Sequence, residues 1–108
     1  MAENKVRTVL ITGAAGGIGQ ATVAHFSSQG WRVIGVDRKA VYASFPADGL
    51  FIQADLALPQ EVERVYREAA VFTPKLDALV NNAAFQVTKP ISETSVEEWD
   101  QVIAVNLR

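Results

Sequence analysis

The sequence contains no cysteine and only one histidine, His25, among its 108 residues. Without cysteine, the chain can form neither disulfides nor thiolate metal sites, and a single histidine does not make a histidine-based metal centre. We therefore predict no metal site. The absence of thiols does not fix the cellular compartment, and the cytoplasm is the default expectation.

Long apolar runs and clusters of basic residues are missing as well. No apolar stretch approaches the roughly 18 residues that a transmembrane helix needs, and residues 1–5 lack the basic start and apolar core of a secretory signal. Lysine and arginine are scattered, and the formal net charge is −2, so nothing marks a surface for nucleic acid. We expect neither a nucleic-acid partner nor a membrane partner.

What the chain does contain is an alternation of strand-like apolar runs with helical patterns. Strands are predicted at 6–12, 31–37, 50–55 and 76–82, and helices at about 17–28, from Pro59 to before Pro74, and from about 94 onward. This alternation predicts an α/β fold with parallel strands joined by right-handed crossovers. The expected sheet is doubly wound and Rossmann-like, with its first four strands in the order 3-2-1-4. Residues 1–108 would form one dinucleotide-binding domain.

The spacing of apolar residues also predicts which helical side chains enter the core. In the first helix, four residues are expected on the inner face: Ile18, Ala21, Thr22 and Phe26. In the second helix, an apolar stripe with a 3.6-residue period includes Val62, Val65, Tyr66, Ala69 and Phe72. We therefore interpret Tyr66 as a core residue. The last helix is expected to bury Trp99, Val102 and Ile103.

The most informative segment is the glycine-rich stretch from Thr12 to Gly19, which follows an apolar run and opens a helical pattern. Glycines let the backbone turn sharply and let a phosphate approach it closely. The first N–H groups of a helix lack intrahelical partners and attract an anion. The stretch predicts a site for a dinucleotide pyrophosphate, and the alternative is a tight strand-to-helix turn that binds nothing.

Asp37 supports the dinucleotide interpretation, because it ends the second predicted strand 18 residues after Gly19. A ribose-binding acid is expected roughly 20 residues after the glycines. A carboxylate there accepts hydrogen bonds from both ribose hydroxyls and repels a 2′-phosphate, so we place NAD ahead of NADP. Arg38 argues the other way, since a guanidinium beside the ribose attracts a 2′-phosphate. The alternative for Asp37 is a solvated acid at a strand end.

Taken together, these residues resemble the N-terminal half of the short-chain dehydrogenase/reductase family. The resemblance rests on five features in the family's order and covers essentially the whole chain. They are Thr-Gly-x-x-x-Gly-Ile-Gly at 12–19, Asp55-Leu56 after the third strand, Asn81-Asn82-Ala83-Ala84 at the end of the fourth, and Trp99 and Val105-Asn106-Leu107 on the following helix. One departure is Ala84, where the family usually has glycine.

The resemblance implies hydride transfer between NAD(P) and a small carbonyl or alcohol substrate, in a protein that forms homo-oligomers. The glycine loop would shape the pyrophosphate site, Asp37 would bind the adenosine ribose, and the pair after the third strand would flank the adenine. The run at the end of the fourth strand would lie along the cofactor, and Asn106 would be the catalytic asparagine. The implied cofactor-binding residues are Gly13, Gly17, Ile18, Gly19, Asp37, Asp55, Leu56, Asn82, Ala83 and Ala84.

Several of these residues also have simpler interpretations. Asp55 can cap the turn before Pro59. Asn82 can be an ordinary turn residue at a strand end, and Asn106 a polar residue at a helix end. Their joint occurrence with the glycine loop favours the functional interpretation.

The family's general acid/base, a tyrosine followed four residues later by lysine, has no counterpart in the sequence. Tyr42 is followed at that spacing by Pro46, and Tyr66 by Ala70. We therefore expect the C-terminal half of the domain, with its tyrosine, lysine and serine, to be absent, and the chain alone to be inactive. The alternative is an NAD-binding module, or a truncated fragment, without redox activity.

An absent C-terminal half would leave the fourth strand without a neighbour on its outer side. An uncovered apolar edge strand pairs with other chains. We therefore expect association through this edge, with a second copy or with a complementary polypeptide.

Overall fold

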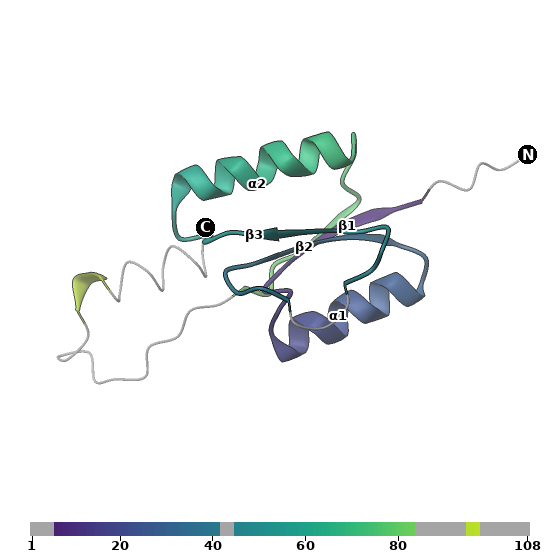
Figure 1. Ribbon diagram of the computed structural model, residues 1–108, viewed down its shortest axis with the longest axis horizontal. Coiled ribbons are helices and arrows are strands. Elements are labelled where there is room, and N and C mark those ends of the chain that lie inside the picture. The colour runs from purple at the N-terminus through teal and green to yellow at the C-terminus, as the bar shows by residue number, and fades with distance from the viewer. Residues whose placement is uncertain (1–5, 42–44, 84–94, 98–108) are drawn as a thin grey trace, which may run out of the picture.

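The structure, a computed structural model, describes residues 6–41, 45–83 and 95–97. The described residues form a four-stranded parallel sheet of β1 (Thr8–Thr12), β2 (Arg32–Asp37), β3 (Leu50–Gln53) and β4 (Ala78–Val80). The strand order is β3-β2-β1-β4, which confirms the predicted α/β class and sheet order. Figure 1 shows α1 (Gly17–Ser28) on one face of the sheet and α2 (Pro59–Phe72) on the other.

The two faces of the sheet are buried under different helices. Successive strand residues point to opposite faces, so alternate residues of each strand join separate core clusters. The cluster under α2 includes Leu10, Ile34, Ile52 and Val65. The cluster under α1 includes Val9, Ile11, Val33 and Val23. Burial on both faces explains why these strands are continuous apolar runs rather than alternating ones.

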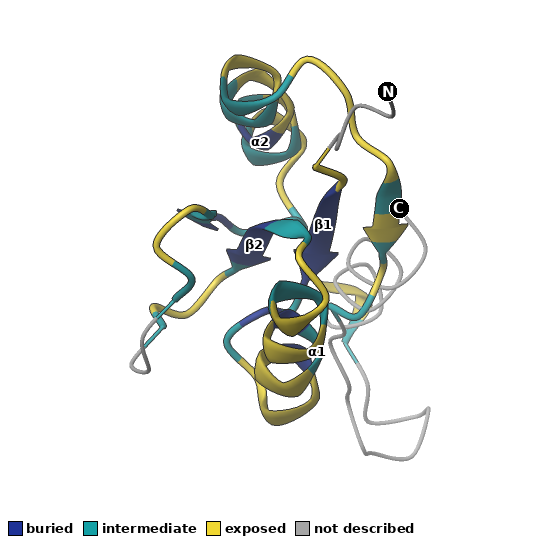
Figure 2. Cartoon of the chain, turned by 90° about the vertical axis from the view of Figure 1, so that its right-hand side faces the viewer, coloured by how far each residue is buried: buried dark blue, intermediate teal, exposed yellow. Residues whose placement is uncertain are grey.

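The two central strands are more deeply buried than the rest of the sheet. All five residues of β1 are buried, whereas β4 has no buried residue. Figure 2 shows the buried colour on β1 and β2 and the exposed colour on the outer turns of both helices. The sheet is therefore best covered at its two central strands, β2 and β1.

Both helices occupy their expected ranges, whereas the strands are shorter than predicted. Val6 and Trp31 precede β1 and β2, Asp55 follows β3, and β4 is limited to Ala78–Val80 instead of 76–82. Each strand was thus predicted one to four residues too long, since hydrophobicity alone does not show where strand pairing stops.

An acid marks the start of β4. The Thr8 N–H donates to Asp77 Oδ2 at 2.8 Å, and the Asp77 N–H donates to the Thr8 carbonyl at 2.9 Å. The Thr8 N–H bond, together with the nearby Lys75, holds the pKa of the Asp77 carboxyl below its ordinary value. Asp77 therefore joins β4 to β1 one residue before the strand ladder begins.

The predicted inner face of α1 is partly wrong. Ile18 is 75% exposed and Ala21 is exposed as well, while Thr22 and Phe26 are half-buried. The buried residues of the helix are Gly19 and Val23. Gly19 lies in close contact with the backbone of Gly13, and we infer that this contact sets the rotation of the helix. The spacing of apolar side chains does not predict such a contact.

Tyr66, which we interpreted as a core residue, is 73% exposed. The buried residue of α2 is its neighbour Val65. Tyr66 lies on an open apolar groove between α2 and β4, which it lines with Leu79 and Val62. The apolar stripe of α2 is therefore wider than the part of it that the described residues cover.

The predicted last helix is scarcely tested. Val96 and Glu97 are helical, whereas Trp99, Val102 and Ile103 lie outside the described residues. Within the part of the chain that the structure describes, no helix is both long enough and apolar enough to cross a membrane.

Candidate functional site

A cavity of about 440 Å³ lies where the carboxyl ends of the strands meet, at one edge of the sheet. Open parallel sheets bind ligands at this edge, where the strand order changes direction. Ala84 and Asn106 lie outside the described residues. The other residues expected at a cofactor site all line this cavity: Gly13, Gly17, Ile18, Gly19, Asp37, Asp55, Leu56, Asn82 and Ala83.

Gly13 turns the chain directly after β1. Its φ is +68°, in the left-handed region that glycine adopts without steric cost. A Cβ on Gly13 would lie 3.0 Å from the backbone N and Cα of Ala83, and the Asn82 side-chain amide donates to the Gly13 carbonyl at 3.4 Å. The loop after β1 and the segment after β4 are therefore in direct backbone contact.

Gly19 brings α1 against the same loop. A Cβ at this position would lie 1.8 Å from the Gly13 carbonyl oxygen, a distance that no real contact allows. Gly17 differs, since a Cβ there would meet nothing within 4 Å. The glycines of the motif thus have two roles: Gly13 and Gly19 make close packing possible, whereas Gly17 leaves open space beside the cavity that it lines.

Thr12 joins β1 to the segment after β4 through its side-chain hydroxyl. Its Oγ1 accepts the N–H groups of Asn82 and Ala83, each at 2.9 Å, and lies 3.3 Å from Asn81 Oδ1, to which it can donate. This role was not expected from the sequence, where Thr12 was only the first residue of the motif. A hydroxyl at the end of a central strand was the available signal.

The N-terminus of α1 opens on the cavity without a side-chain cap. Gly16 is the N-cap residue, no side chain bonds to the helix start, and the first turn contains no acid. The N–H groups of a first helical turn lack intrahelical partners, and the helix dipole adds partial positive charge there. This end of the cavity is chemically suited to an anion.

Asp37 presents a carboxylate in the lining of the same cavity. Its Oδ2 accepts the Ala15 N–H at 2.9 Å, and its Oδ1 accepts the Lys39 N–H at 2.9 Å. Each oxygen of an ionised carboxylate has a second lone pair, so the anchored group can still accept hydrogen bonds from a ligand. Arg38 and Lys39 also line the cavity, and Lys39 was not expected there.

Asp55 has the simpler role that was considered for it, in addition to lining the cavity. Its Oδ1 accepts the Ala57 N–H at 3.0 Å, and its carbonyl accepts the Leu58 N–H at 3.1 Å. These bonds form the turn that leads from β3 into α2. The side chain therefore shapes the loop that places Leu56 at the cavity.

No group of three or more potential metal ligands is brought together among the described residues. The polar groups around the cavity are instead backbone N–H donors, a carboxylate acceptor near each of two strand ends and two cationic side chains. This combination is suited to a ligand that combines phosphate with hydroxyl groups.

The sequence model of the family described as short chain dehydrogenase matches residues 7–108. The chain belongs to the short-chain dehydrogenase family. It is 35% identical to an uncharacterised oxidoreductase of Thermotoga maritima, over 99% of this chain and 44% of the relative. It is 33% identical to meso-2,3-butanediol dehydrogenase of Serratia marcescens, over 97% of this chain and 43% of that enzyme.

A solved family structure has the same fold. The short-chain dehydrogenase of Leptospira borgpetersenii, with bound NAD+, matches with a TM-score of 0.85 and 28% identity, over 99% of this chain and 44% of that one. The chain therefore spans less than half the length of each of these three relatives.

The glycine contacts predict opposite effects of two similar substitutions. Gly19→Ala forces a methyl group into the Gly13 carbonyl and should lower the free energy of unfolding by about 1–3 kcal/mol or more. Gly17→Ala meets no atom within 4 Å and should leave stability unchanged or raise it by up to about 1 kcal/mol. Urea unfolding followed by circular dichroism measures both, and equal stability of the two variants would contradict the packing role of Gly19.

Proposed function

We propose that the cavity binds NAD(H) and that the chain is the cofactor-binding portion of an oxidoreductase. The observation that supports this most strongly is that the Asp37 carboxylate and the uncapped N-terminus of α1 line the same cavity. A dinucleotide carries a pyrophosphate and a ribose diol, which need an anion site and an acceptor at a fixed separation.

Each part of the cofactor has a proposed partner in the lining. The N–H groups of Gly17, Ile18 and Gly19 would face the pyrophosphate, and Asp37 would accept the ribose hydroxyls. Asp55 and Leu56 would flank the adenine. Asn82, Ala83 and Ala84 would follow the cofactor toward its nicotinamide. The NAD+ bound to the Leptospira relative supports NAD(H) as the ligand of a chain with this fold.

We place NAD ahead of NADP because Asp37 is held by two backbone N–H groups, of Ala15 and Lys39. A carboxylate fixed in this way would repel a 2′-phosphate at the ribose. The cations of Arg38 and Lys39 oppose this preference, but they are side chains of an exposed turn, where screening by water and salt weakens their attraction.

Asp37→Ala should lower NAD+ affinity by about 10- to 100-fold, because hydrogen bonds to a charged group contribute roughly 1.5–3 kcal/mol each. NADP+ affinity should stay the same or rise, since the repulsive carboxylate is gone. Isothermal titration calorimetry on the 108-residue chain measures both. Asp48→Ala is the matched control, because it removes the same charge from an exposed loop residue outside the cavity lining. An unchanged ratio of the two affinities would remove Asp37 from the site.

For the complete protein we propose hydride transfer between the cofactor and a carbonyl or alcohol of a small molecule. NAD supplies the hydride chemistry when it is bound, and the chain supplies its binding and orientation. Asn106 is the proposed catalytic asparagine. The general acid/base must come from elsewhere, because neither tyrosine of the sequence has a lysine four residues later.

The second candidate is a nucleotide-binding module without redox chemistry, which the missing tyrosine–lysine pair favours. The reading frame beyond the codon for Arg108 separates the two. A serine followed by Tyr-x-x-x-Lys in that frame would support the oxidoreductase, and its absence would support the binding module.

The 108-residue chain alone should not oxidise NADH with any ketone or aldehyde. An unperturbed phenol has a pKa near 10, and a positioned acid/base works best near the operating pH, but neither tyrosine of the sequence is followed four residues later by the lysine that the family uses. The measurement is NADH absorbance with a panel of small carbonyl compounds, on a sample whose mass has been verified. Carbonyl-dependent NADH oxidation above the background would contradict this expectation.

We also propose that the chain associates through β4, with a second copy or with a complementary polypeptide. In the described residues β4 pairs only with β1, and Leu79 is 62% exposed on it. An uncovered strand of this kind pairs readily with another chain.

Light scattering at micromolar concentration should therefore detect species larger than a monomer, and Leu79→Lys should reduce them. Val71→Lys is the matched control, since Val71 is 90% exposed on α2 and does not line the groove beside β4. A monodisperse monomer of the unchanged chain would contradict the proposed association.

A further inference from the structure

The turn after β2 is held by hydrogen bonds from the end of the neighbouring strand, β3. Asp37 pairs with Gln53 in the ladder between these strands, and the Ala54 N–H donates to the Asp37 carbonyl at 2.9 Å. One residue further on, the Gln53 side-chain amide Nε2 donates to the Arg38 carbonyl at 3.1 Å. Gln53 therefore holds the backbone between Asp37 and Lys39.

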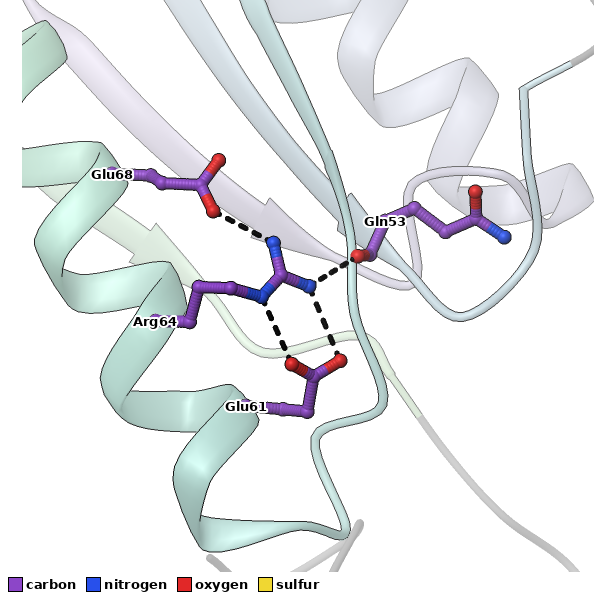
Figure 3. Close-up of polar contacts among 4 residues, drawn as sticks. All are labelled: Gln53, Glu61, Arg64 and Glu68. Carbon is purple, nitrogen blue, oxygen red and sulfur yellow. Dashed lines mark hydrogen bonds and ion pairs between the residues drawn. The ribbon is translucent and has the colours of Figure 1, made fainter.

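Gln53 is itself fixed from the opposite side by α2. Arg64 Nη2 donates to the Gln53 carbonyl at 2.6 Å. The guanidinium is oriented by two further bonds, from Nε to Glu61 Oε2 at 2.9 Å and from Nη1 to Glu68 Oε2 at 2.7 Å. Figure 3 shows the Gln53 carbonyl facing Arg64 while its side-chain amide extends away on the far side of the strand. Bonds to Glu61 and Glu68 raise the pKa of Arg64, and the bond from Arg64 lowers the pKa of Glu61.

The position of this turn determines what the cavity presents at its Asp37 end. Asp37 Oδ1 accepts the Lys39 N–H, so the direction of the carboxylate depends on the backbone that Gln53 holds. Arg38 and Lys39 line the same part of the cavity. A displaced turn would move the carboxylate from this position, while the cationic side chains of Arg38 and Lys39 would still line the cavity.

We propose that Gln53 is a positioning residue for Asp37 and thereby sets the preference of the site for a free ribose 2′-hydroxyl over a 2′-phosphate. This inference rests on the proposed NAD site. Gln53 itself does not line the cavity, so its effect on the preference passes through the backbone of Arg38.

The test measures the dissociation constants of NAD+ and NADP+ for the 108-residue chain and for Gln53→Met. Methionine keeps the length of the side chain and removes the N–H donor. The ratio of the NADP+ constant to the NAD+ constant should fall by about three- to tenfold, the effect of losing one ordinary hydrogen bond. Gln60→Met is the matched control, since Gln60 is exposed on the first turn of α2 and lies outside the cavity lining, and it should leave the ratio unchanged.

A double-mutant cycle separates positioning from general destabilisation. In an Asp37→Ala background, Gln53→Met should change the ratio by less than about twofold, because coupled residues are not additive. If Gln53 contributes to stability alone, its substitution would weaken the binding of both cofactors equally and leave the ratio of the two dissociation constants unchanged. Circular dichroism checks the folding of each variant, and Gln53→Leu, with the same expected result, replaces Gln53→Met if the latter does not fold.

The outcomes distinguish this inference from the function on which it rests. If the unchanged chain binds no NAD+, both the proposed function and the inference are wrong. If Asp37→Ala changes the ratio and neither Gln53 variant does, the NAD site stands and the role of Gln53 is overturned. An equal effect of Gln53→Met with and without Asp37 would also overturn it.

Discussion

The site depends on a backbone contact that excludes side chains. Gly19, in the first turn of α1, lies so close to the Gly13 carbonyl that a Cβ would be 1.8 Å from its oxygen. Gly13 in turn adopts a positive φ against the backbone of Ala83. The loop after β1, the start of α1 and the distant segment after β4 thus meet at one point. The uncapped helix start faces the cavity because this contact sets where α1 begins.

Hydrogen bonds among the strand ends complete this arrangement. The Thr12 hydroxyl joins β1 to Asn82 and Ala83, the Asp37 carboxylate joins β2 to the Ala15 N–H, and Gln53 joins β3 to the turn after β2. Each bond connects a strand to a loop that follows a neighbouring strand, so contacts within the chain itself shape the cavity. Such preorganisation lowers the entropy cost of binding a flexible dinucleotide.

The fold was largely predictable, because it follows from properties that the sequence displays locally. Apolar runs buried on both faces, together with helical periods between them, indicate the strands and both helices, and the strand order follows from the doubly wound fold that this alternation is typical of. Where prediction failed, the cause was not local. Ile18 is exposed because the contact at Gly19 sets the rotation of α1. Tyr66 is exposed because the apolar stripe of α2 is wider than the part of it that the described residues cover. The spacing of apolar residues predicts neither a close glycine contact nor an open groove.

The candidate site was predictable to a similar extent. The expected residues that the structure describes line one cavity, since the carboxyl ends of parallel strands necessarily share an edge. The positioning contacts of Thr12 and Gln53 were not predictable, because they depend on which loop lies opposite each strand end. Membership of the short-chain dehydrogenase family is consistent with a site of this kind, in a chain that spans 44% of the length of the Thermotoga and Leptospira relatives.

The central claim is that one cavity, at the strand ends, takes the cofactor. Titration of the isotope-labelled 108-residue chain with NAD+, followed through its backbone amide NMR signals, tests this most directly. The account predicts shifts at the glycine loop, at the turn from Asp37 to Lys39 and at Asn82–Ala83, with none at Tyr66 and Leu79 in the groove between α2 and β4. Shifts confined to that groove would contradict it. So would the absence of shifts at millimolar NAD+, since a dissociation constant of about 1 mM already corresponds to a weak binding free energy of about −4 kcal/mol.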